Sequence, residues 1–131
     1  MEQYASLDTL QKAVDIFKAV NLDAIACGDH AASFILGKDH EEYLIEKLQK
    51  QSGCPVTFPS RSIVRLIKNK NFKDILLVSP YSKDITEKFE RYLGDYNIKT
   101  VDSVSLEATD EVQINSSVSY THLTLPTTYT V

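Results

Sequence analysis

Three short segments carry side chains that could hold or react with a small anion. They are residues 28–33 (Gly-Asp-His-Ala-Ala-Ser), residues 57–60 (Thr-Phe-Pro-Ser) and residues 79–82 (Ser-Pro-Tyr-Ser). Each follows an apolar run and precedes a helical pattern, so that peptide N–H groups and hydroxyls would meet there and suit a carboxylate or a phosphate. Helix capping explains any one of these segments taken alone.

Short apolar strands alternate with amphipathic helices around these segments. Strands are expected at residues 23–27, 55–58, 75–79 and 98–104. Residues 75–79 are continuously apolar up to the final serine, which predicts a central strand with Leu76 and Val78 buried. This alternation predicts a doubly wound, flavodoxin-like parallel α/β sheet, whose strand-to-helix loops share one edge.

Polar residues and glycines mark where the helices between these strands begin and end. Ser6, Asp39, Ser60 and Ser82 are expected to begin four helices, Asp39 as part of a capping box. Gly53 is expected to end the second helix in the left-handed conformation. The basic stretch 61–73 alternates with apolar residues and predicts the solvated face of an amphipathic helix.

Composition excludes several classes of function. The net charge of −4 argues against a nucleic-acid partner. Two cysteines fit neither a zinc site nor a disulfide framework, and four glycines cannot spell a phosphate-binding loop, so no metal or nucleotide cofactor is expected. No apolar run is long enough to cross a membrane and the start of the chain lacks signal-peptide character, so a cytoplasmic location is expected.

Residues 115–131 differ from the rest of the chain. They contain no Lys, Arg, Asp or Glu and are rich in Ser and Thr. Residues 117–127 back-translate without a mismatch to a string that resembles a transposase adapter from DNA sequencing libraries. We therefore expect residues 115–131 to be an artefactual, unstructured tail. The alternatives are a disordered polar tail and an edge strand. Residues 1–114 are expected to be one incomplete domain of a longer protein.

Residues 23–34, 53–57 and 79–81 together resemble the aspartate/glutamate racemase superfamily, in the branch of the maleate isomerases and arylmalonate decarboxylases. The resemblance extends over about residues 7–108. It implies two similar α/β halves with the active site between them, no cofactor, and a small carboxylate held by amides and hydroxyls. Such enzymes move a proton at the substrate's α-carbon, typically with a cysteine from each half. The resemblance is also compatible with a homodimeric full-length protein.

The chain departs from the family pattern at the first-half cysteine, where it has Asp29. Asp29 is therefore the candidate catalytic base, although a carboxylate there would repel a dicarboxylate substrate. Cys27, two residues earlier, fits a buried strand cysteine better than a displaced nucleophile. The candidate substrate-binding residues are His30, Ala31, Ser33, Tyr81 and Ser82.

Two classes of function follow from these residues. The first is half of a cofactor-independent racemase, isomerase or decarboxylase acting on a small carboxylate. The second is a non-catalytic carboxylate-binding or regulatory relative that lost the cysteine. A flavodoxin-like module outside the family is a third alternative. A second-half cysteine would favour the enzyme.

Overall fold

The structure is a computed structural model in which residues 6–108 are described. The described elements in chain order are α1 (Leu7–Ile16), β1 (Ile25–Ala26), α2 (His30–Phe34), α3 (Lys38–Ser52), β2 (Val56–Thr57), α4 (Pro59–Lys70), β3 (Ile75–Ser79), α5 (Lys83–Asp95) and β4 (Thr100–Ser105). Within this range, no helix has both the length and the apolarity needed to cross a membrane.

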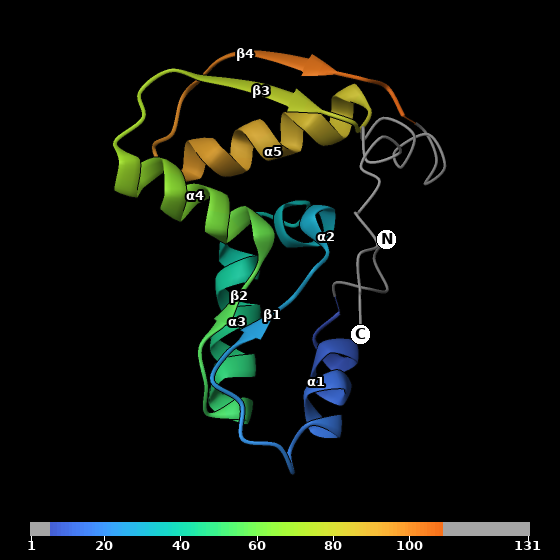
Figure 1. Ribbon diagram of the computed structural model, residues 1–131. Coiled ribbons are helices and arrows are strands. Elements are labelled where there is room, and N and C mark those ends of the chain that lie inside the picture. Colours follow the sequence, from blue (N-terminus) through green and yellow to red (C-terminus); the bar gives the residue numbers. More distant parts are fainter. Residues whose placement is uncertain (1–5, 109–131) are drawn as a thin grey trace, which may run out of the picture.

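The described strands form two parallel pairs. β1 pairs with β2, with Ile25 opposite Val56. β3 pairs with β4, with Val78 opposite Val104. In Figure 1 the β3–β4 pair forms a layer over α5, while α1, α3 and the β1–β2 pair occupy the other end. Parallel strands joined by helices confirm the predicted α/β class, and the two pairs remain separate sheets among the described residues.

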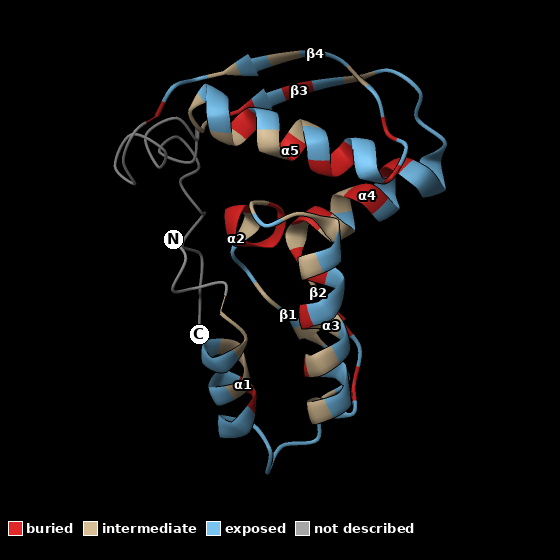
Figure 2. Cartoon of the chain, turned by 180° about the vertical axis from the view of Figure 1, so that it is seen from behind, coloured by how far each residue is buried: buried red, intermediate tan, exposed pale blue. Residues whose placement is uncertain are grey.

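The predicted burial of Leu76 and Val78 is wrong. β3 occupies the predicted residues, but Leu76 is 61% exposed and Val78 58% exposed, whereas the alternate residues Leu77 and Ser79 are buried. The reason is that α5 lies against one face of the β3–β4 pair, and no described helix covers the opposite face (Figure 2). A strand covered on a single face alternates in burial even when its sequence is continuously apolar.

Some predicted helix ends are confirmed and others are wrong. Ser6 caps α1, its hydroxyl accepting a hydrogen bond from the Thr9 amide at 3.3 Å, and Gly53 ends α3 with a φ of 74°. Asp39 does not begin α3, because Gly37 turns the chain at a φ of 85° and the helix starts at Lys38.

The predicted start of α4 is also corrected, and one helix was not predicted. Phe58, not Ser60, precedes α4, and Pro59 takes its first position, where a missing amide proton does no harm. Ser60 is thereby turned into the interior, where it is fully buried. The short helix α2 follows β1 directly and has no counterpart in the sequence-based prediction.

The interior of the described part of the chain contains two apolar clusters. One joins α2, α4, β3 and α5 through buried residues that include Phe34, Val64 and Phe89. The other joins α1, α3 and β2 through buried residues that include Leu44 and Leu48. The short helix α2 contacts α3, α4 and α5, so it links the two clusters and fixes the segment that contains Asp29 and His30.

Candidate functional site

Asp29 lies between the end of β1 and the start of α2, as the strand-end prediction requires. Its Oδ1 accepts a hydrogen bond from the Ala32 amide at 3.1 Å and so caps α2. The residue is exposed, and it lines one end of an apolar cavity of about 500 Å³ between α1 and β1. A carboxylate in this position is held by a local hydrogen bond while remaining open to a ligand.

His30 lies in a cluster of aromatic rings. Its ring centroid is 5.1 Å from that of Phe34 and 4.8 Å from that of Phe89, both edge-on. The Tyr81 ring stacks on it at 6.2 Å. Burial lowers the pKa of His30, and the neighbouring Asp29 carboxylate offsets part of this effect. The Nε2 atom is buried without a hydrogen-bond partner, so the arrangement favours a neutral imidazole over the positive charge that would attract a carboxylate.

Tyr81 brings the end of β3 to the same place. Its amide donates a hydrogen bond to the Ser79 hydroxyl at 3.2 Å, which fixes the turn after the strand. Burial raises the pKa of the Tyr81 phenol, and the Asp29 carboxylate raises it further. The Tyr81 ring therefore lies against His30 although they come from two different strand ends, whereas Asp29 lines the cavity, whose lining includes neither ring.

Ser33 and Ala31 face the interior of the protein. Ser33 is 1% exposed, and Ala31 is also buried. The Ser33 hydroxyl donates to the His30 carbonyl oxygen at 2.7 Å and lies 2.6 Å from the Ser60 hydroxyl. This serine pair ties α2 to the first turn of α4, so both hydroxyls already have partners.

Ser82 is engaged with its own helix. It precedes α5, and its hydroxyl donates a hydrogen bond to the Asp84 carboxylate. Its carbonyl oxygen accepts from the Thr86 amide at 2.9 Å and from the Thr86 hydroxyl at 3.0 Å. These contacts describe an ordinary helix start, with Ser82 following directly on Tyr81.

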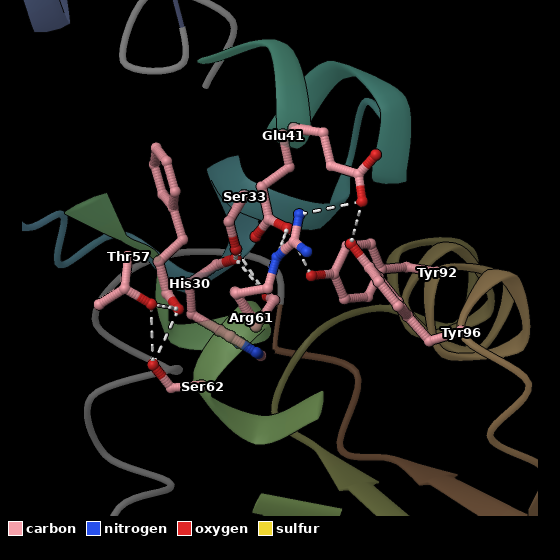
Figure 3. A network of polar contacts seen from close by, with 11 residues as sticks. His30, Ser33, Glu41, Thr57, Arg61, Ser62, Tyr92 and Tyr96 are labelled. Atoms are coloured by element: carbon pink, nitrogen blue, oxygen red, sulfur yellow. Dashed lines mark hydrogen bonds and ion pairs between the residues drawn. The ribbon is translucent and has the colours of Figure 1, made fainter. Parts of the chain in front are cut away.

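A buried ion pair joins α3, α4 and α5 behind this site (Figure 3). The Glu41 side chain is 0% exposed, and its Oε2 accepts from Arg61 Nε at 3.0 Å and from the Tyr92 hydroxyl at 2.7 Å. Arg61 Nη2 also lies 3.3 Å from Glu42, and the guanidinium lies over the Tyr96 ring, 5.1 Å from its centroid. Arg61 is therefore unavailable as a carboxylate-binding cation.

The sequence-based interpretation missed this ion pair. The pattern of residues 61–73 predicts Arg61 on the solvated face of its helix, but its side chain is only 17% exposed. A signal was present in the spacing of α3: Glu41 precedes Leu44 by three residues and Leu48 by seven, which places it on the buried face of that helix. A glutamate at such a position requires a buried partner.

The cysteine nearest the site is not activated. Cys27 lines the same cavity as Asp29, and burial raises the pKa of its thiol, whereas reactive cysteines have a lowered one. Within residues 6–108, no three His, Cys, Asp or Glu side chains are grouped as metal ligands would be.

Comparison with known proteins gives consistent results. The family model described as arylmalonate decarboxylase matches residues 2–129. Maleate isomerase of Alcaligenes faecalis is 26% identical over 72 residues, which is 53% of this chain and 28% of that protein.

Two solved structures share the fold. Unliganded arylmalonate decarboxylase superposes with a TM-score of 0.72 at 16% identity, covering 79% of this chain and 44% of that one. A Nocardia farcinica maleate cis-trans isomerase variant with a covalently bound succinylcysteine intermediate gives 0.73 at 16% identity, covering 87% and 53%. The chain thus spans less than a third of the curated relative and about half of each structural relative. Since the family match covers nearly the whole sequence, the chain belongs to the arylmalonate decarboxylase family.

Proposed function

We propose that this chain supplies one half of a cofactor-independent racemase, isomerase or decarboxylase that acts on a small carboxylate. The observation that supports this most directly is the position of Asp29, an exposed carboxylate at a strand end beside His30 and Tyr81. Membership of the family adds the class of reaction, since the relatives are named a decarboxylase and two isomerases.

In the proposed mechanism Asp29 is the base. Its carboxylate takes the proton from the substrate's α-carbon, and the electron pair of the C–H bond moves into the carbonyl group to give an enolate. Returning a proton to the opposite face gives the inverted product. In a decarboxylation the bond between the α-carbon and a carboxylate breaks instead: CO₂ leaves, the electron pair of that bond moves into a neighbouring carbonyl group of the substrate, and the α-carbon then receives a proton. Peptide N–H groups and hydroxyls beside the site stabilise the negative charge in either case.

Asp29 makes the proposed reaction different from one that depends on cysteine at this position. The Nocardia farcinica isomerase is described with a succinylcysteine intermediate, a covalent adduct of a cysteine. A carboxylate acts more readily as a base than as a nucleophile toward a double bond. We therefore propose proton transfer, not covalent addition, as the role of this half of the site.

The lack of a positive charge near Asp29 limits how many carboxylates the proposed substrate can carry. Half-buried His30, with its lowered pKa, carries little positive charge, and Arg61 is paired with Glu41 and Glu42. A second substrate carboxylate close to Asp29 would be repelled by it, with no positive charge nearby to offset the repulsion. The proposed substrate therefore carries one carboxylate held by Tyr81 and peptide amides, with its α-carbon toward Asp29.

The test compares the longer gene product with its Asp29→Asn and Asp29→Cys variants. Asparagine caps a helix about as well as aspartate, so Asp29→Asn removes the base while α2 keeps its cap. We expect Asp29→Asn to lose at least about 100-fold in solvent-deuterium incorporation at the α-carbon, the lower bound for a general base. Asp29→Cys should keep measurable exchange. Carboxylate probes are screened by NMR, and residues 1–131 alone should be inactive.

The same experiment separates the alternatives. Unchanged turnover in Asp29→Asn, with unchanged thermal unfolding, would remove Asp29 from the mechanism. Carboxylate binding without exchange in the wild-type protein would instead identify the non-catalytic relative. We also propose a cytoplasmic location and a homodimeric full-length form, which fractionation and sedimentation of the tagged gene product would test.

A further inference from the structure

A pair of buried hydroxyls connects α4 to the first turn of α2. The side chains of Ser33 and Ser60 are both fully buried. The Ser33 hydroxyl donates to the His30 carbonyl oxygen at 2.7 Å, and the Ser60 hydroxyl lies 2.6 Å from that of Ser33. The two serines are 27 residues apart in the sequence, so their contact depends on the packing of α2 against α4.

The number of protons determines how these hydroxyls are bonded. A serine hydroxyl donates one proton and can accept a hydrogen bond at the same time. Since the Ser33 proton goes to the His30 carbonyl oxygen, the contact between the two hydroxyls uses the Ser60 proton. The hydrogen bonds therefore run from Ser60 to Ser33 and from Ser33 to the His30 carbonyl oxygen. We call these three groups the serine chain.

The short helix α2 depends on such support from outside. It has five residues, far fewer than the roughly 12 at which an isolated helix becomes stable in water. The serine chain holds the first turn of α2 from the interior of the protein. At the surface of the same turn, the Asp29 carboxylate accepts a hydrogen bond from the Ala32 amide at 3.1 Å. The orientation of this turn therefore sets where the Asp29 carboxylate lies.

We infer that Ser60 is a positioning residue for Asp29, acting through Ser33 and the first turn of α2. The inference rests on the proposed function of Asp29 as the base, and it adds a residue of another helix that holds this base in place. A general base must lie within hydrogen-bond reach of the proton that it takes. Because a displacement of about 1 Å can lower a rate about 100-fold, loss of the Ser60 hydroxyl should lower turnover although Asp29 is still present.

Ser62 provides a matched control in the same helix. Its hydroxyl donates to the Phe58 carbonyl oxygen at 3.1 Å and lies 3.2 Å from the Thr57 hydroxyl, so these contacts join α4 to the end of β2 (Figure 3). Ser62→Ala therefore removes the same atom as Ser60→Ala but leaves the serine chain intact. Ser60→Cys is a second control, because a thiol fills the space of the hydroxyl but is a weak donor.

The first measurement needs no substrate. Amide hydrogen exchange of the 131-residue chain reports how often the hydrogen bond from the Ala32 amide to Asp29 opens. We expect the Ala32 amide to exchange at least about fivefold faster in Ser60→Ala and Ser60→Cys, the effect of one lost hydrogen bond. Its exchange should be unchanged in Ser62→Ala. Thermal unfolding verifies that every variant is folded.

The second measurement follows solvent-deuterium incorporation at the substrate's α-carbon in the longer gene product. We expect Ser60→Ala to lower kcat at least about tenfold, with KM within about twofold of the wild type, because the interaction lost acts on the base and not on substrate binding. Added to Asp29→Asn, the same substitution should cause no further loss, because a residue that acts only through Asp29 then has no carboxylate to position.

Three results would overturn the inference. The first is unchanged exchange of the Ala32 amide in Ser60→Ala. The second is wild-type exchange and kcat in Ser60→Cys, since the Ser60 side chain would then only fill space. The third is an equal fall in kcat when Ser60→Ala is added to the wild type and to Asp29→Asn, which would make its role purely structural.

Failure of the proposed function is seen separately. Wild-type turnover in Asp29→Asn alone would show that Asp29 is not the base. The exchange of the Ala32 amide would still decide whether Ser60 holds the Asp29 carboxylate in place.

Discussion

The Asp29 side chain faces solvent and the apolar cavity, while that of His30, the next residue, lies among the rings of Phe34, Tyr81 and Phe89. The two side chains thus point in different directions, although Asp29 directly precedes α2 and His30 is its first residue. One consequence is that Asp29 is open to solvent, whereas His30 contributes to the packing. A second consequence is that protonation of His30 opposes folding.

We predict that acid weakens the fold through His30. Burial lowers its folded pKa below the ordinary value, so the unfolded chain binds more protons as the pH falls below about 6.5. The stabilising contribution of neutral His30 is therefore complete above that pH and is lost below it. In urea titrations between about pH 7.5 and pH 5, the free energy of unfolding should decline less in His30→Phe than in the wild type.

Tyr81→Phe is the control for this measurement, because it keeps the imidazole and the aromatic contact. It should retain the wild-type decline with acid. Equal pH dependence in His30→Phe and the wild type would show that His30 does not cause the decline.

At the scale of elements, β3 is buried on one face only. Leu77 packs with Phe89 and Leu93 of α5 in the larger cluster, whereas Leu76 points away from them. The two leucines are adjacent and chemically identical, so their difference comes entirely from the element that lies opposite each one.

This pair gives a direct prediction. Leu77→Ala should lower the free energy of unfolding by about 2–5 kcal/mol, the range for a buried leucine. Leu76→Ala should change it by less than about 0.5 kcal/mol, as at an exposed position. Urea unfolding of both variants provides the measurement. A large loss in Leu76→Ala would mean that an additional element covers this face in solution.

The Glu41–Arg61 ion pair joins α3 to α4, and the Tyr92 hydroxyl ties Glu41 to α5. The two charged side chains depend on each other. Burial raises the pKa of the Glu41 carboxyl, while its hydrogen bond from Tyr92 and the charge of Arg61 act in the opposite direction. The Oε1 atom of Glu41 is buried without a partner. Removing Arg61 alone therefore leaves an uncompensated buried carboxylate.

A double-mutant cycle tests this dependence. Arg61→Met should cost about 3 kcal/mol in the free energy of unfolding, the lower end for breaking a buried pair, because part of the guanidinium is exposed. Adding Glu41→Leu should recover much of that loss, since apolar replacements of buried pairs are often neutral. Additive effects of the two substitutions would contradict the coupling.

On the scale of the whole molecule, α2 holds two apolar clusters together. It contacts α3, α4 and α5, while β1–β2 and β3–β4 remain separate sheets in the described part of the chain. The site at Asp29 thus depends on a short helix fixed from three sides. The chain covers about half the length of its structural relatives.

Residues 115–131 lie outside the described residues, and their adapter-like origin stays a prediction. The family match extends to residue 129 and so includes most of this segment. If the segment derives from an adapter, its deletion should leave the thermal unfolding temperature unchanged or raise it. A loss above about 2 kcal/mol, the effect of one well-buried side chain, would contradict the adapter origin.

Features that depend on near neighbours in the chain can be predicted from the amino-acid sequence. These are the α/β alternation, the position of β3, the Ser6 cap and the left-handed Gly53. Each depends on backbone conformation or on hydrogen bonds within a few residues. The strand-end location of Asp29 follows from the same local pattern.

Which side chains are buried, and with which partners, depends on how distant elements pack together. The exposure of Leu76, the aromatic surroundings of His30 and the pairing of Glu41 with Arg61 all involve elements distant in sequence. A residue's own pattern gives the face it occupies but not the element that covers that face. Burial, and with it the pKa of His30 and the environment of Asp29, is therefore set by packing between elements.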